Sequence, residues 1–143
     1  MGELFHLLVA ERNSNIRDFL CRELSAEGYR VMSAKDGGEV KKLVFGDERL
    51  DLIILDHDLP LGGVELLDDI SKRSPPAPVI LHSLLRKREC EAAVLDRVSA
   101  YLEKTGDNLD LVKQTVELTL GDHFPERFRS FLAKRPGAGS GDE

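Results

Sequence analysis

The most informative stretch of the sequence is LDLIILDHDLPLGG (50–63), which joins an apolar run to a cluster of charged residues. Residues 52–55 are all apolar, a pattern that favours a strand buried on both faces. Asp56 and Asp58 follow at once, and Pro60 with two glycines then predicts a turn. The stretch therefore predicts a buried strand that delivers a carboxylate to the edge of a sheet.

Four other short apolar segments resemble this strand, and amphipathic segments with helix-capping residues separate them. The predicted strands are residues 4–10, 29–34, 50–55, 78–83 and 99–104. The predicted helices follow the capping residues Asn13 and Asp36, cover 64–70 and 86–95, and run from Asp107 or Asn108 to residue 120. This alternation predicts an α/β fold with a parallel sheet and helices on both faces.

Composition and charge exclude several classes of protein. The 143 residues fit one domain of ordinary size, and 41% of them are hydrophobic, which is enough for a core. The net charge of −6 argues against direct binding to nucleic acid. No apolar stretch approaches the roughly 20 residues of a membrane span, and Glu3 and His6 interrupt the only apolar segment near the start. We therefore expect a cytoplasmic protein whose Cys21 and Cys90 are reduced.

The last part of the chain differs from the rest. Residues 122–135 carry three phenylalanines on one side of a predicted helix, which we expect to cover the surface of the domain itself. Residues 136–143 are small and polar, and they predict a disordered tail. The predicted division is thus a domain over 1–121, a helical extension and a tail, with no further output domain.

Chemically active residues follow the ends of four predicted strands. Glu11 follows the first strand, Asp56 the third, Ser83 the fourth and Lys104 the fifth. The carboxyl ends of parallel strands meet at one edge of a sheet, where ligands bind. A carboxylate there can attack a phosphoryl group, whose oxygens need a cation and hydrogen-bond donors. Magnesium accepts one or two carboxylates together with water and phosphate oxygens, so Glu11 and Asp56 are candidate ligands.

Three motifs in this order resemble the receiver domain of two-component response regulators. They are DLIILDHDLP, PVILHS and AYLEK, and the resemblance covers about residues 4–120. It implies a flavodoxin-like, doubly wound, five-stranded parallel sheet of order 2-1-3-4-5. It also implies that Asp56 is the phosphoacceptor, Lys104 the phosphate-pairing lysine, Ser83 the switch hydroxyl and Tyr101 the switch aromatic.

The same resemblance implies a cofactor and partners. Magnesium would be held by Glu11, Asp56 and the backbone carbonyl of Asp58. A sensor histidine kinase or a histidine phosphotransfer protein would supply the phosphoryl group, and a downstream protein would read the result. A weak homodimer is also compatible with the resemblance. The domain would not be an enzyme, beyond magnesium-dependent self-phosphorylation and dephosphorylation.

Three departures from the family pattern leave a second interpretation open. Ala10 stands where the family usually has a second acid, Leu84 where it has alanine or glycine, and Thr105 where it has proline. A pseudo-receiver, which docks on partners and signals without phosphorylation, would tolerate all three.

A remote third interpretation comes from the Asp-x-Asp pattern of Asp56 and Asp58. Phosphatases similar to haloacid dehalogenases carry this pattern after an apolar strand, with the second aspartate as acid and base. In that family the motif follows the first strand, whereas here it follows the third. No acidic pair follows a later strand either, so we rank this interpretation last.

Overall fold

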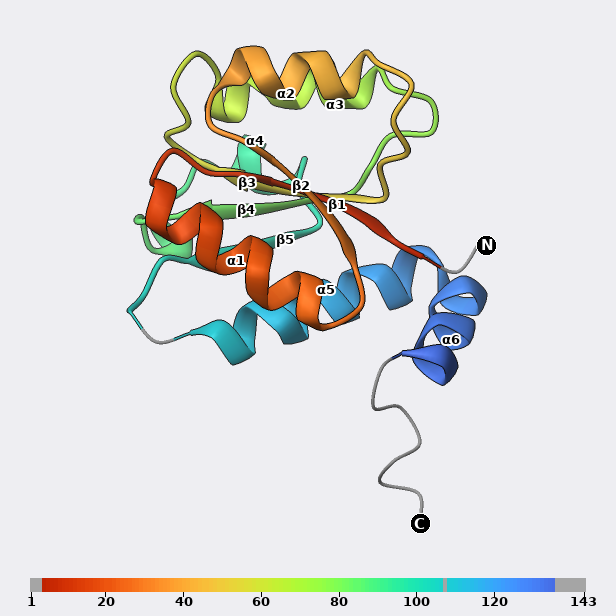
Figure 1. The fold of residues 1–143 in the computed structure, drawn as a ribbon. Coiled ribbons are helices and arrows are strands. Elements are labelled where there is room, and N and C mark those ends of the chain that lie inside the picture. Colours follow the sequence, from red (N-terminus) through yellow and green to blue (C-terminus); the bar gives the residue numbers. More distant parts are fainter. Residues whose placement is uncertain (1–3, 107, 136–143) are drawn as a thin grey trace.

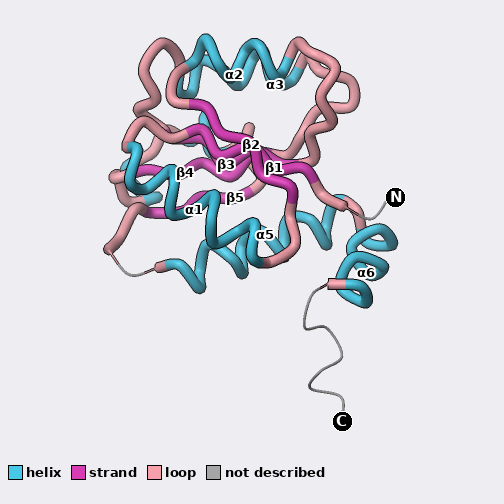
Figure 2. The backbone as a smooth tube through the Cα atoms, viewed as in Figure 1, coloured by secondary structure: helices cyan, strands magenta, loops and turns pink. Residues whose placement is uncertain are grey.

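A computed structural model describes residues 4–106 and 108–135 of the chain, and the predicted tail at 136–143 lies outside these ranges. Its centre is a sheet of five parallel strands in the order β2-β1-β3-β4-β5 (Figure 2). The strands are β1 (His6–Ala10), β2 (Arg30–Ala34), β3 (Leu52–Asp56), β4 (Val79–Ser83) and β5 (Ala100–Glu103). Both the parallel sheet and its order are therefore as predicted.

Helices cover both faces of the sheet (Figure 1). One face carries α1 (Ser14–Ala26) and α5 (Leu109–His123), and the other carries α2 (Gly37–Val44) and α3 (Leu66–Ser71), which a 3₁₀ turn, η1 (Gly63–Glu65), precedes. The remaining elements are η2 (Lys87–Glu89), α4 (Ala92–Leu95) and α6 (Pro125–Lys134). No helix within the described ranges is long and apolar enough to span a membrane.

Successive residues of the central strands feed two separate apolar clusters. Ile53 and Leu55 pack in the cluster under α2 and α3, whereas Leu52 and Ile54 pack in the cluster under α1 and α5. All four side chains are buried, and burying one such side chain contributes about 1.5–3 kcal/mol to folding. A run of apolar residues without polar alternation is what a strand covered on both faces requires.

Side-chain caps build two of the predicted helix starts, those of α1 and α2. The side chain of Asn13 accepts a hydrogen bond from the amide of Ile16 at 3.0 Å, and that of Asp36 accepts one from Glu39 at 3.0 Å. These caps satisfy amides that the first helical turn leaves without partners. They fix where α1 and α2 begin, and hence how the preceding strands end. The predicted cap at Asn108 is wrong: its side chain does not cap α5 and donates to the Glu103 carbonyl at 2.8 Å instead, while Asp107 lies outside the described residues.

The prediction of a helix over 86–95 is wrong. The structure has only η2 and the four-residue α4 in this region. Between them Cys90 and Glu91 adopt extended backbone conformations, with ψ angles of 142° and 137°. The segment offers only a short apolar side for burial, and without an apolar stripe a helix of this length gains little from packing.

The helix after β5 extends further than predicted, to His123, and α6 begins two residues later. Phe128 and Phe131 on α6 are buried and contact Phe5, with ring centroids 5.9 and 5.4 Å away. Arg127 makes a two-pronged contact with the buried Asp51, at 3.0 and 2.9 Å. The extension therefore covers the amino-terminal edge of the sheet, close to the start of β1 (Figure 1).

Candidate functional site

Asp56 is the last residue of β3, and its side chain is 1% exposed. Its Oδ1 atom lies 2.9 Å from the Lys104 ammonium and accepts a hydrogen bond from the Asp58 amide at 3.1 Å. Its Oδ2 atom accepts one from the Arg12 amide at 3.1 Å. Burial raises the pKa of Asp56, but these hydrogen bonds outweigh burial and lower the pKa below its ordinary value. The carboxylate is thus held ionised, as a nucleophile must be.

Lys104 follows β5 and joins the two acids predicted for the site. Its ammonium lies 2.9 Å from Asp56 and 3.1 Å from Glu11, and only 9% of the side chain is exposed. Its backbone amide also donates to the carbonyl of Ser83 at 2.6 Å, which anchors the strand end. The structure therefore brings together the three charged residues that the sequence placed at this edge.

Glu11 lies directly after β1 and is buried. Its Oε2 atom accepts a hydrogen bond from the Asn13 amide at 3.1 Å. Its Oε1 atom has no hydrogen-bond partner in the described chain, although Lys104 lies within ion-pair distance. A buried carboxylate oxygen without a hydrogen bond has capacity left for another ligand.

Ser83, the predicted switch hydroxyl, ends β4 and is buried. Within the described residues it makes no hydrogen bond to Asp56. Its Oγ atom lies 2.9 Å from Nδ1 of His57 and accepts a hydrogen bond from the Leu85 amide at 3.0 Å. His57 was not among the predicted site residues. Its place directly after Asp56, at the end of a strand that pairs with the one ending in Ser83, was the available signal.

Tyr101, the predicted switch aromatic, lies on β5 with its side chain partly buried. Its hydroxyl donates to the carbonyl of Leu85 at 2.6 Å, so the ring is tied to the loop that follows Ser83. The bulky Leu84 in that loop is 65% exposed, so its side chain points to solvent. The only cis peptide bond in the described chain precedes Pro75. The bond before Thr105 is therefore trans, as expected for a residue other than proline.

Arg12 is a second residue that the sequence analysis missed. Its Nε atom lies 3.7 Å from Oδ2 of Asp56, and its Nη2 atom lies 3.9 Å from Oδ2 of Asp58. The carboxylate of Asp58 is 56% exposed, so the second aspartate of the motif faces outward. The two acids of the opening stretch thus have different surroundings, and a single guanidinium lies near both.

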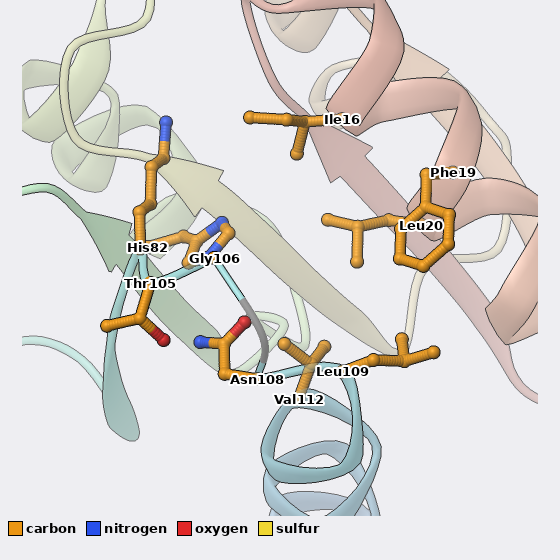
Figure 3. A pocket seen from close by; sticks show the side chains of 10 residues that line it. Ile16, Phe19, Leu20, His82, Thr105, Gly106, Asn108, Leu109 and Val112 are labelled. Atoms are coloured by element: carbon orange, nitrogen blue, oxygen red, sulfur yellow. The ribbon is translucent and has the colours of Figure 1, made fainter.

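A cavity of about 240 Å³ lies beside this cluster, between α1 and α5 (Figure 3). Ile16, Phe19 and Leu20 line one side, and His82 lies across from them with Thr105. His82 is 5% exposed, and neither ring nitrogen has a hydrogen-bond partner in the described chain. Burial and the nearby Lys104 lower the pKa of His82 to about 4, so the ring is neutral at pH 7.

The residues at this site can hold magnesium, with fewer acidic ligands than the family pattern provides. Glu11 and Asp56 supply two carboxylates, and Oε1 of Glu11 has unused capacity. Two carboxylates suffice for an ion that keeps several waters and binds phosphate oxygens. No group of three or more acidic, histidine or cysteine side chains suited to a metal occurs in the described ranges. The Lys104 ammonium lies between the two carboxylates, so an ion there would share them with a cation already present.

A family model for the response regulator receiver domain matches residues 7–116, most of the chain. The chain belongs to this receiver domain family. The transcriptional regulatory protein GlrR of Escherichia coli is 30% identical over 137 residues, which are 91% of this chain. Response regulator RR06 of Streptococcus pneumoniae is 36% identical over 92 residues. The chain spans 30% of the length of GlrR and 42% of that of RR06.

Solved receiver structures share the fold. The response regulator TrrA of Thermotoga maritima, in complex with Mg²⁺ and BeF, matches with a TM-score of 0.66 and 28% identity, over 80% of this chain and 99% of that one. A structure of histidine kinase ThkA in complex with TrrA matches with a TM-score of 0.71 and 30% identity, over 82% and 99%. The receiver fold and the link to two-component systems are therefore established for this chain.

Proposed function

We propose that this receiver domain accepts a phosphoryl group on Asp56 and signals through contact with another protein. The observation that carries the proposal is the pair formed by Asp56 and Lys104. A buried, ionised carboxylate at a strand end has a buried ammonium 2.9 Å away, which can then pair with phosphoryl oxygens. TrrA, a similar receiver, occurs in complex with a histidine kinase, so a phosphohistidine of a kinase or phosphotransfer protein is the proposed donor.

In the proposed transfer, the Asp56 carboxylate attacks phosphorus and the donor leaves with its electron pair. Lys104 holds a phosphoryl oxygen and so offsets the charge that arrives. The hydroxyl of Ser83 turns from His57 toward the new group and donates a hydrogen bond to it. Because Tyr101 is tied to the loop after Ser83, this loop and the ring move together, which changes the surface near β5.

Magnesium belongs to the same proposal. Glu11, Asp56 and the carbonyl of Asp58 would hold the ion, which when bound neutralises charge on the phosphoryl group. The Mg²⁺–BeF complex of TrrA supports this assignment. We further propose a cytoplasmic location, a downstream protein partner and no direct contact with nucleic acid. A weak homodimer stays a prediction.

Phosphorylation with acetyl phosphate tests the proposal. Intact mass should rise by one phosphoryl group in the wild type and stay unchanged in Asp56→Ala. Circular dichroism of Asp56→Ala controls for its folding. Repeated turnover of a phosphate ester, in contrast, would favour the phosphatase interpretation based on Asp58.

One observation favours the pseudo-receiver as a second candidate. Both oxygens of Asp56 already have partners, and Lys104 is shared with Glu11. A carboxylate whose two oxygens are already paired can serve as a fixed element of structure. If the wild type gains no mass with acetyl phosphate, with or without magnesium, and binds no beryllofluoride, this candidate replaces phosphorylation.

A further inference from the structure

We propose that Arg12 binds the phosphoryl group carried by Asp56, so that phosphorylation is only partly dependent on magnesium. The inference rests on the proposed phosphorylation of Asp56 and adds a residue to it. Arg12 lies in the loop between β1 and α1, directly after the buried Glu11.

The two oxygens of Asp56 face different cations. Lys104 lies 2.9 Å from Oδ1, whereas the amide and the Nε atom of Arg12 lie 3.1 and 3.7 Å from Oδ2. A phosphoryl group joined to either oxygen therefore arrives with a cation beside it. Lys104 is buried and fixed between two acids, while Arg12 approaches from the loop.

The donors of the Arg12 guanidinium are available. The contacts at 3.7 Å to Asp56 and 3.9 Å to Asp58 are ion pairs too long to be hydrogen bonds. No other side-chain hydrogen bond from Arg12 occurs in the described chain, and 40% of the side chain is exposed. A planar guanidinium with free N–H groups matches phosphate oxygens in a two-pronged contact.

The charge balance of the site supports the same role. The three carboxylates of Glu11, Asp56 and Asp58 outnumber the two cations, Arg12 and Lys104, by one negative charge. When Asp56 attacks acetyl phosphate, an O–P bond forms and acetate leaves with the electron pair. The carboxylate loses its charge and a phosphoryl group of about two negative charges replaces it. Arg12 lies where this extra charge appears.

Position 10, at the end of β1, supplies no second acid beside Glu11. Ala10 is buried there and offers no carboxylate for a divalent ion. The site therefore has one acid fewer than the family pattern to attract magnesium, and Arg12 is a cation that can attract phosphate. Both differences shift phosphoryl binding from a metal to Arg12.

Phosphorylation by acetyl phosphate in EDTA and in saturating magnesium tests the inference. We expect the wild type to gain one phosphoryl mass in both buffers, with Arg12→Ala at least about tenfold slower in EDTA, as the loss of a charge-assisted hydrogen bond implies. Arg12→Lys should retain part of the EDTA rate. Arg22→Ala removes a more exposed arginine of α1, and its rates should equal those of the wild type.

A magnesium titration by calorimetry provides a readout that does not involve phosphorylation. Arg12→Ala should bind magnesium several-fold more tightly, because the guanidinium no longer competes for Asp56. Equal EDTA rates for the wild type and Arg12→Ala, or a wild type that needs magnesium absolutely, would overturn the role of Arg12 and leave the proposed function intact. A wild type that gains no mass in either buffer would overturn both.

Discussion

The hydroxyl of Ser83 lies 2.9 Å from Nδ1 of His57, so the proposed switch residue is bound to the neighbour of the phosphoacceptor and not to the phosphoacceptor itself. The Leu85 amide donates to the same oxygen, so the hydroxyl already has two neighbours. In the tautomer in which Nδ1 accepts from Ser83, the hydroxyl has to leave His57 before it can donate to a phosphoryl group on Asp56. His57 therefore stabilises the unphosphorylated arrangement.

Substitution of His57 should make the switch easier to operate. In His57→Ala the hydroxyl loses a hydrogen bond that contributes about 0.5–1.5 kcal/mol, so we expect acetyl phosphate to phosphorylate Asp56 about 2- to 10-fold faster. Intact mass against time measures the rate. His123→Ala, on α5 and remote from the site, is the matched control. A slower rate in His57→Ala would mean that the ring assists the transfer instead.

Removal of the Lys104 charge should destabilise the fold. Lys104→Gln leaves two buried carboxylates without the ammonium that lies between them, which costs about 3–5 kcal/mol at pH 7. Urea unfolding measures the loss. Lys113→Gln is the control, because Lys113 pairs with Glu23 and Glu27 at the surface and its removal should cost about 1 kcal/mol or less. Adding Glu11→Gln to Lys104→Gln should recover part of the stability.

Stability should fall as the pH is lowered from about 6.5 to 4. Burial lowers the pKa of His82 to about 4. Between pH 6.5 and 4, His82 is therefore protonated in the unfolded chain and neutral in the folded chain. The expected loss is about 3 kcal/mol. His6, whose pKa burial also lowers, acts in the same direction. Asp56 acts mainly below this window: its pKa is lowered by its hydrogen bonds, so its stabilising effect is lost as the pH falls through the unfolded and then the folded pKa.

The variant His82→Leu isolates this effect. It removes two buried nitrogens that lack partners in the described chain, so it should be at least as stable as the wild type at pH 7.5. Its urea midpoint should also change less between pH 7.5 and 5 than that of the wild type. A wild-type slope that persists in His82→Leu would assign the titration to another group.

The helical extension should contribute to the stability of the domain. Phe131 is 3% exposed, stacks on Tyr29 at 5.1 Å and meets Phe5 edge to face. Phe131→Ala should therefore lower the free energy of unfolding by about 3–5 kcal/mol, measured with urea. Leu132→Ala, one position along and 38% exposed, should cost much less. Equal costs would show that α6 does not dock as described.

The fold was predictable because its signals are local and repeated. Apolar runs such as 52–55, each followed by an amphipathic segment, specify α/β alternation without knowledge of contacts. The prediction of a helix over 86–95 failed because the apolar side of this segment is weak. Contacts with the rest of the domain then determine its backbone conformation. The meeting of Asp56 with Lys104 was also predictable, since parallel strands end at one edge of the sheet.

Arg12 and His57 were not predictable in the same way. Each is a loop residue whose role depends on side-chain direction, which strand periodicity does not give. His82 shows the opposite case. Its place beside Asp56 follows from the strand register, but its lack of hydrogen-bond partners depends on the apolar cavity formed by α1 and α5. The sequence alone places a residue such as His82 near the site but does not show which groups hydrogen-bond to it.

The packing of α6 against Phe5 has a practical consequence for experiments with this protein. Residue 135 and the start of β1 lie at one pole of the domain, and Asp56 lies at the other, across a strand of five residues and about 17 Å. A fluorophore attached at residue 4 or residue 135 would therefore lie at the pole opposite Asp56. A protein immobilised at that pole would present the carboxyl ends of its strands to solution.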